Sequence, residues 1–252
     1  MPKGRPEIVV TPDLSTLIEI AVKRVAARIS QARSTVAICL TGGSTPKPIY
    51  QRFATEPYRS ELPWNSIQWF WGDDRFVPLD DERSNAGMAR AAFLDRLPIP
   101  PANIHAIPTS APNPHEAALQ YEKELKRFYG CHRLDPERPL FDLVLMGLGS
   151  DGHTASLFPG DTALSEKDCW VVGVEKAGLP PFVPRVSLTF PVLASTREMI
   201  FLVSGQDKRD AVDLVLSGQD LPAARAHAIG NLVWLMDRSA APEAYRVSSG
   251  GP

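Results

Sequence analysis

The sequence predicts an α/β fold, a mostly parallel sheet with helices on both faces, and two observations carry this prediction. Apolar runs typical of strands alternate with segments whose apolar residues recur at helical spacing, the order expected of a parallel sheet with crossover helices. The runs TVAICLTG (35–42) and FDLVLMGLG (141–149) are continuously apolar, as in strands buried on both faces. We expect a single domain over 1–252, with its core over about 7–238.

The predicted elements follow in chain order. Helices are predicted over 13–31, 46–54, about 83–97, 114–129 and about 206–217. Strands are predicted over 7–11, 35–42, 67–74, 103–108, 141–149, 170–175, 185–190, 199–205 and 232–237. Asp13 or Thr11 is placed to cap the first helix, and Pro46 stands early in the second, where its missing N–H costs nothing. Pro-rich stretches at 98–114 and 178–184 predict surface loops, and we expect the tail SSGGP to be disordered.

Composition excludes several classes of protein. The formal net charge of -2 gives no general attraction to nucleic acid, and no basic stripe is interleaved with aromatic residues. No run approaches the roughly 18 apolar residues of a membrane span, and the start shows no secretory signal. The cysteines, Cys39, Cys131 and Cys169, are widely spaced and predict no disulfide framework, with Cys39 a buried thiol. We expect a soluble cytoplasmic protein with no nucleic-acid or membrane partner.

The segment TGGSTP (41–46) joins a predicted buried strand to a helix. Gly42 and Gly43 let the backbone approach a ligand, Ser44 and Thr45 offer hydroxyls, and the helix start offers free N–H groups. This combination suits an anion, above all a phosphate. The alternative is a tight turn in which Thr45 caps the helix. Neither a Walker A loop nor GxGxxG spacing is present.

The segment WGDDR (71–75) ends the third predicted strand with two carboxylates and an arginine. Asp73, Asp74 and Arg75 would be costly to bury without partners, so they are candidates for an acid, a base or a substrate clamp. The alternative is a structural Asp–Arg pair at the rim of the sheet. The sequence does not decide which of the two aspartates faces a site.

The segment GLGSDGH (147–153) follows the clearest buried strand. Its glycines allow backbone N–H groups to point inward at a phosphate or an oxyanion. His153 is the one side chain of this cluster that can shuttle a proton near neutral pH, and Asp151 can orient it. The alternative is that His153 merely caps a helix TASLF (154–158).

Arg185 and Lys208 form a candidate cation pair. Arg185 opens the strand RVSLTF, and Lys208 stands in the first turn of the following helix, where a cation opposes the helix macrodipole. An anionic ligand there would offset that cost, whereas the alternative is a solvated surface lysine. No GxSxG or HExxH motif and no zinc spacing occurs. The remaining histidines, His105, His115, His132 and His227, are interpreted as surface or loop residues.

Taken together, these segments resemble the 6-phosphogluconolactonases. The resemblance rests on motifs in the family's order from about 36 to 238, namely LTGGSTPKPIYQ, WFWGDDRFVP with ERSNAGMA, FDLVLMGLGSDGHTASLFPG, RVSLTFPVLAS and FLVSGQDK. Two departures stand out. GDDR replaces the family's more frequent GDER, and the segment KAGLPPFVP before Arg185 is longer and less regular than expected.

The resemblance implies a modified Rossmann-like fold of the glucosamine-6-phosphate deaminase type and hydrolysis of 6-phosphoglucono-1,5-lactone, without cofactor or metal. It implies that His153, oriented by Asp151, activates water without a covalent intermediate. Arg75 and Asp73 then contact the sugar or the lactone. Gly42, Gly43, Ser44, Thr45, Arg185 and Lys208 then hold the phosphate. A sugar phosphate is the expected partner of a monomer or weak homo-oligomer.

Two rival functions remain. A deaminase acting on glucosamine 6-phosphate would use the same phosphate loop, with Asp73 moving a proton between carbons, but that group has a segment closer to IAFNEP where this chain has TASLFPG. A silent sugar-phosphate binding module is the second rival, and the retained Asp151 and His153 argue against it.

Overall fold

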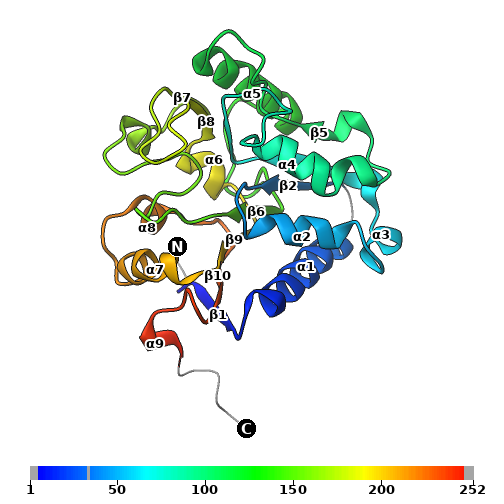
Figure 1. Cartoon of the computed structure of the whole chain (residues 1–252). Coiled ribbons are helices and arrows are strands. Elements are labelled where there is room, and N and C mark those ends of the chain that lie inside the picture. Colours follow the sequence, from blue (N-terminus) through cyan, green and yellow to red (C-terminus); the bar gives the residue numbers. More distant parts are fainter. Residues whose placement is uncertain (1–4, 33–34, 247–252) are drawn as a thin grey trace.

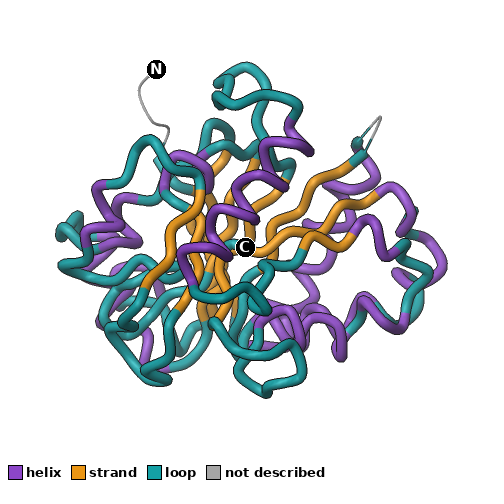
Figure 2. Tube along the Cα trace, turned by 90° about the horizontal axis from the view of Figure 1, so that it is seen from above, coloured by secondary structure: helices purple, strands orange, loops and turns teal. Residues whose placement is uncertain are grey.

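The computed structural model describes residues 5–32 and 35–246. Its main sheet has seven strands in the order β1-β10-β9-β6-β2-β3-β5, and every neighbouring pair is parallel. The bounds are β1 Glu7–Thr11, β2 Val36–Leu40, β3 Ile67–Trp71, β5 Ile104–His105, β6 Leu143–Met146, β9 Glu198–Val203 and β10 Asn231–Asp237. Helices flank the strands on both sides (Figure 2). The predicted α/β fold with a mostly parallel sheet is confirmed, whereas the tail SSGGP lies outside the described ranges.

The helices follow the predicted alternation (Figure 1). Their bounds are α1 Leu14–Gln31, α2 Pro46–Phe53, α3 Tyr58–Glu61, α4 Asn85–Ala92, α5 Pro114–Tyr129, α6 Phe190–Ala194, α7 Arg209–Leu216, α8 Pro222–Arg225 and α9 Glu243–Arg246. Asp13, not Thr11, caps α1, because its carboxylate accepts a hydrogen bond from the Thr16 N–H at 2.8 Å. Thr45 precedes α2 but makes no side-chain cap, so the alternative interpretation of that residue as a cap is wrong.

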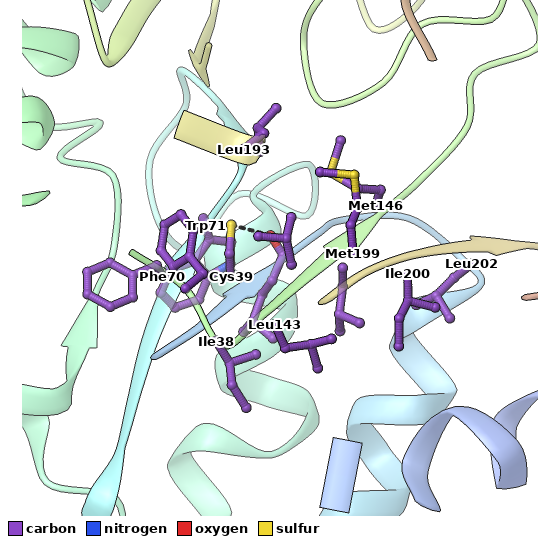
Figure 3. Close-up of a cluster of buried hydrophobic side chains, with 14 of the residues drawn as sticks. Ile38, Cys39, Phe70, Trp71, Leu143, Met146, Leu193, Met199, Ile200 and Leu202 are labelled. Atoms are coloured by element: carbon purple, nitrogen blue, oxygen red, sulfur yellow. Dashed lines mark hydrogen bonds between the residues drawn. The ribbon is translucent and has the colours of Figure 1, made fainter. Parts of the chain in front are cut away.

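The core lies between the central strands and their covering helices. All five residues of β2 are buried, which explains its continuous apolar run. Figure 3 shows side chains of β2, β3, β6 and β9 packed together with Leu193 of α6. Cys39 is among them and is fully buried, as predicted. Burial of each such side chain stabilises the fold by roughly 1.5–3 kcal/mol, and this fixes the strands whose ends carry the polar residues.

A second, three-stranded antiparallel sheet stands beside the main one, and the sequence did not predict it. Its order is β4-β8-β7, with bounds β4 Asp73–Arg75, β7 Val171–Val174 and β8 Arg185–Leu188. The predicted strand 67–74 is therefore two strands, divided at Gly72. The Gly72 N–H donates to the Leu40 carbonyl at 2.9 Å, and its own carbonyl accepts from the Leu188 N–H at 2.8 Å. Gly72 thus bonds to strands of both sheets. Helix α5 packs on β7 and β8 of the second sheet.

Several predicted elements are shorter than expected, for identifiable reasons. The helix predicted over 83–97 ends at Ala92, because Phe93 leaves helical geometry with φ of −152°, and a 3₁₀ turn follows. The helix predicted over 206–217 begins as a 3₁₀ turn, Gln206–Lys208, before α7. The strand predicted over 185–190 ends early because Thr189 and Phe190 begin α6. The strand predicted over 103–108 retains only β5.

The topology places two loops next to each other. β2 and β6 are neighbours, yet the chain continues from β2 to β3 on one side and from β6 to β9 on the other. The loops leaving their carboxyl ends therefore diverge, and they open a crevice of the kind where α/β proteins bind ligands. The segments TGGSTP and GLGSDGH are these two loops.

Candidate active site

A cavity of about 200 Å³ lies at this crevice. Seven of the predicted site residues line it, namely Gly42, Gly43, Asp73, Arg75, His153, Arg185 and Lys208. Ser44, Thr45 and Asp151 are outside the lining, and Ser44 is exposed. Both sheets contribute, since Asp73, Arg75 and Arg185 come from the second sheet. Segments that lie far apart in the sequence therefore meet at one place.

His153 is held by its neighbour Asp151. The ring Nδ1 lies 2.6 Å from Oδ1 of Asp151, and the same oxygen accepts the His153 backbone N–H at 3.0 Å. Burial acts to raise the pKa of Asp151, but the hydrogen bonds from His153 outweigh it and hold that pKa below its ordinary value. An ionised Asp151 favours a proton on Nδ1, and Nε2 meets no hydrogen-bonding partner in the described chain. His153 itself lines the cavity.

The backbone around His153 leaves no room for side chains. A Cβ on Gly149 would lie 2.0 Å from Nδ1 of His153, so only glycine fits there. Residues 154–158 form a turn and not a helix, because Thr154 and Leu157 pair in an isolated bridge. The interpretation of His153 as a helix cap is therefore wrong. Its ring packs on Phe158 instead, with centroids 4.5 Å apart.

The two adjacent aspartates have different surroundings. Asp74 is 1% exposed and its carboxylate accepts the backbone N–H groups of Arg75, Asn85 and Ala86 at 2.7, 2.6 and 3.0 Å. Burial raises the pKa of Asp74 to about 6, against the effect of these bonds. Asp73 lines the cavity instead. Asp74 thus anchors the start of α4, and Asp73 faces the site.

Arg75 and Arg185 are neighbouring cations that make no direct ion pair in the described chain, although Asp73 and Asp74 lie near enough to attract the charge of Arg185. They are directly opposite each other on β4 and β8, a register in which like charges repel. Arg185 is 5% exposed, and it donates through Nε to the Val183 carbonyl at 3.2 Å and through Nη2 to the Pro181 carbonyl at 2.9 Å. Burial, and then the charge of Arg75, lowers the pKa of Arg185. Neither arginine forms an ion pair with any described carboxylate, so an anion between them would relieve the repulsion.

Hydrogen bonds fix the first residue of the loop after β2, whereas the next two residues have backbone N–H groups without a described partner. The buried Tyr50 hydroxyl accepts the Thr41 N–H at 3.0 Å and donates to the Thr41 carbonyl at 2.8 Å. The backbone N–H groups of Gly42 and Gly43 donate to no residue in the described ranges. Gly43 has φ of 111°, a conformation that favours glycine. Two unused donors beside the helix start suit an anion.

Two further polar residues of the site were not predicted from the sequence, Asn85 in the cavity lining and Ser156 in contact with Asp73. Asn85 lines the cavity, and its amide donates to the Asp73 carbonyl at 3.0 Å. It stands in the motif ERSNAGMA, which could have identified it. Ser156 is fully buried and its hydroxyl donates to Oδ2 of Asp73 at 2.6 Å. The interpretation of His105 as a surface or loop residue is wrong. Its ring stacks on Phe70, with centroids 4.3 Å apart.

Residues 5–32 and 35–246 hold neither a metal-binding cluster nor a membrane-spanning helix. In this part of the chain no group of three or more His, Cys, Asp or Glu side chains could hold a metal ion. None of its helices combines the length and the apolarity that crossing a membrane requires.

Comparisons with known proteins indicate the same family as the sequence motifs. A family model described as "Glucosamine-6-phosphate isomerases/6-phosphogluconolactonase" matches residues 12–234. A protein of Synechocystis named 6-phosphogluconolactonase is 41% identical over 93% of this chain and 97% of its own length. One of Nostoc with the same name is 39% identical over 93% and 96%.

Solved structures agree with this result. The 6-phosphogluconolactonase of Thermotoga maritima has a TM-score of 0.81 at 30% identity, covering 93% of this chain and 100% of its own. A monomeric glucosamine-6-phosphate deaminase has a TM-score of 0.78 at 20% identity, over 93% and 98%, and shows a shared fold alone. The family that the motifs predicted is thus confirmed, and the chain belongs to the glucosamine-6-phosphate isomerase/6-phosphogluconolactonase family.

Proposed function

We propose that this chain is a 6-phosphogluconolactonase, which hydrolyses 6-phosphoglucono-1,5-lactone to 6-phosphogluconate in the oxidative pentose phosphate pathway. The observation that carries the proposal is a histidine, held by Asp151 through Nδ1, that lines the same cavity as two arginines without an ion-pair partner in the described chain. The curated relatives named 6-phosphogluconolactonase support it. The proposal includes a single domain, a cytoplasmic location, a monomer or weak homo-oligomer, and no cofactor or metal.

In the proposed reaction, Nε2 of His153 takes a proton from a water molecule, which attacks the lactone carbonyl. Asp151 holds Nδ1–H, so that the imidazolium formed in this step is stabilised. The tetrahedral oxyanion then collapses, the C1–ring-oxygen bond breaks, and His153 returns its proton to the leaving ring oxygen. No covalent intermediate forms. Asp73 and Arg75 contact the sugar or the lactone from the second sheet.

The phosphate of the substrate is proposed to lie between the loop 42–45 and the cations Arg185 and Lys208. The free N–H groups of Gly42 and Gly43 and the unpaired charge of Arg185 support this placement. Ser44 and Thr45 are outside the cavity lining, and their part in phosphate binding stays a prediction.

A comparison of two lactones tests this function. Purified protein is given freshly made 6-phosphoglucono-1,5-lactone or glucono-1,5-lactone, each against an enzyme-free blank. We expect kcat/KM to be at least about 10²-fold higher for the phosphorylated lactone, because charge-assisted bonds to the phosphate contribute roughly 1.5–3 kcal/mol each. Equal kcat/KM values for the two lactones would mean that the cavity does not bind phosphate.

Replacing Lys208 with alanine tests the phosphate contact. We expect KM for the phosphorylated lactone to rise about tenfold while kcat changes little, because the ammonium is a remote anchor away from the reacting carbon. Steady-state kinetics with both lactones checks this. An unchanged KM and kcat/KM would remove Lys208 from the phosphate site.

The deaminase is the alternative that shares most of this site. Its test is release of ammonia from glucosamine 6-phosphate, measured with the same protein sample. In this chain Phe158 packs on His153, and it stands in the segment TASLFPG, which differs from the deaminase segment. The two curated relatives above are named 6-phosphogluconolactonase. We therefore expect no ammonia above the blank.

A further inference from the structure

The short turn that carries Lys208 buries no side chain of its own, although α7, which follows directly, buries Ala211, Val212 and Val215. None of the residues of its 3₁₀ turn, Gln206–Lys208, is buried. The turn is closed by the Lys208 N–H, which donates to the Gly205 carbonyl at 3.1 Å, and Gly205 enters it with φ of 106°. Apolar packing therefore fixes the neighbouring β9 and α7, and polar contacts add to the placement of the turn itself, where the lysine side chain starts.

Those contacts come from the turn that follows β10. Before the lysine, the Ser204 hydroxyl donates to Oδ2 of Asp237 at 2.5 Å, and the Gly205 N–H donates to Oγ of Ser239 at 3.2 Å. After the lysine, Nη2 of Arg209 donates to the Ser239 carbonyl at 2.8 Å. The turn with Lys208 is therefore attached on both sides to residues 237–239.

Asp237 is the centre of this network. It is 5% exposed, and its Oδ1 accepts from the Ser239 hydroxyl at 2.6 Å, from the Ala240 N–H at 2.9 Å and from the Gly205 N–H at 3.4 Å. Burial acts to raise its pKa, but hydrogen bonds from Ser204 and Ser239 outweigh this and lower it. The Asp237 carboxylate pairs with no cation of the described chain and lies outside the cavity lining. Lys208 itself pairs with its exposed neighbour Asp207, Nζ to Oδ2 at 3.4 Å.

We propose that Asp237 is a positioning residue for Lys208, acting through Ser204, Gly205 and Ser239 on the turn that aims the lysine at the cavity. This inference rests on the proposed function of Lys208 as a phosphate contact. A lysine is a point charge on a flexible stem, so its ability to reach an anion depends on where its backbone is held. Loss of the carboxylate should therefore weaken binding of the phosphate and leave the chemistry at His153 intact.

The test compares Asp237→Asn, Lys208→Ala and the double variant with the wild type. Asparagine keeps the shape but loses the charge that strengthens the bonds from Ser204 and Ser239. Two quantities are measured: the Kd of 6-phosphogluconate by calorimetry, and kcat and KM for the phosphorylated and unphosphorylated lactones. Free energies of unfolding are measured in denaturant for every variant.

Asp142→Asn is the matched control. This carboxylate also accepts a backbone N–H, that of Ala37 at 2.9 Å, and it pairs with Arg197, Nε to Oδ1 at 3.1 Å, but it lies at the opposite, amino end of the main sheet. We expect it to lower stability without changing the Kd. Ser239→Ala is a milder second variant for the case that Asp237→Asn does not fold, and it should weaken binding in the same direction.

We expect Asp237→Asn to raise the Kd and the KM of the phosphorylated ligands about three- to tenfold, the size of one or two hydrogen bonds. We expect kcat and the kinetics with the unphosphorylated lactone to stay within about twofold. In the Lys208→Ala background the same change should add little, because both substitutions remove one interaction.

Three kinds of result would overturn the proposal, and a fourth would refute only the proposed reaction. Equal effects with and without Lys208, or equal effects on both lactones, would show that Asp237 acts on the fold and not on the lysine. An unchanged Kd in both Asp237→Asn and Ser239→Ala would show that the network is not needed. An unchanged Kd in Lys208→Ala would remove Lys208 from phosphate binding and the inference with it, whereas absence of turnover with tight binding would refute only the proposed reaction.

Discussion

Replacing His153 with alanine is expected to lower kcat for the phosphorylated lactone by about 10²–10⁴-fold, the usual contribution of a general base. The reason is geometric, because His153 is the only histidine among the cavity-lining residues and its Nε2 has no other described partner. Affinity for 6-phosphogluconate should change little, since the phosphate anchors lie elsewhere. Turnover is measured by coupling product formation to 6-phosphogluconate dehydrogenase, with the enzyme-free rate subtracted.

His132→Ala is the control for this substitution. His132 is exposed and lies outside this cavity, so its replacement should leave both kcat and KM unchanged. A His153→Ala variant that keeps its secondary structure and more than about a tenth of the wild-type kcat would exclude His153 as the general base.

Replacing Arg185 with methionine is expected to lower the activity with little effect on the free energy of unfolding. We expect kcat/KM for the phosphorylated lactone to fall about 10–100-fold, because a buried guanidinium makes charge-assisted bonds to an anion. The free energy of unfolding should change by no more than about 1 kcal/mol, because relief of the repulsion from Arg75 offsets the loss of the hydrogen bonds to the Val183 and Pro181 carbonyls. Kinetics and denaturant unfolding on one sample measure both.

Arg127→Met provides the matched comparison, since Arg127 is an exposed arginine paired with Glu124 on α5. Neither its kinetics nor its stability should change appreciably. A large loss of stability in Arg185→Met, with kcat/KM reduced no more than the stability loss explains, would mean that Arg185 supports the fold and does not hold a ligand.

Much of the site could be predicted because parallel strands end at one edge. The strand-end segments TGGSTP, WGDDR and GLGSDGH were each recognisable, and the topology brought residues of all three to one cavity. The pair of Asp151 and His153 could be predicted as well, because two residues of separation in a glycine-rich loop allow the side chains to meet.

The rest depended on contacts between distant segments. Which aspartate faces the cavity is decided at Gly72, where the chain passes from one sheet to the other, and a single strand was the simpler prediction. The irregular loop 178–184 proved to hold Arg185 through two backbone carbonyls, which no side-chain pattern encodes. The hydroxyl of Ser156 on Asp73 and the network around Asp237 join residues far apart in sequence and gave no local signal.

The rate of hydrolysis of freshly made 6-phosphoglucono-1,5-lactone by the wild-type protein, against an enzyme-free blank, tests the central claim most directly. Spontaneous ring opening makes that blank essential. We expect turnover far above the blank, together with no ammonia released from glucosamine 6-phosphate. A rate equal to the blank, or ammonia release by the same sample, would contradict it.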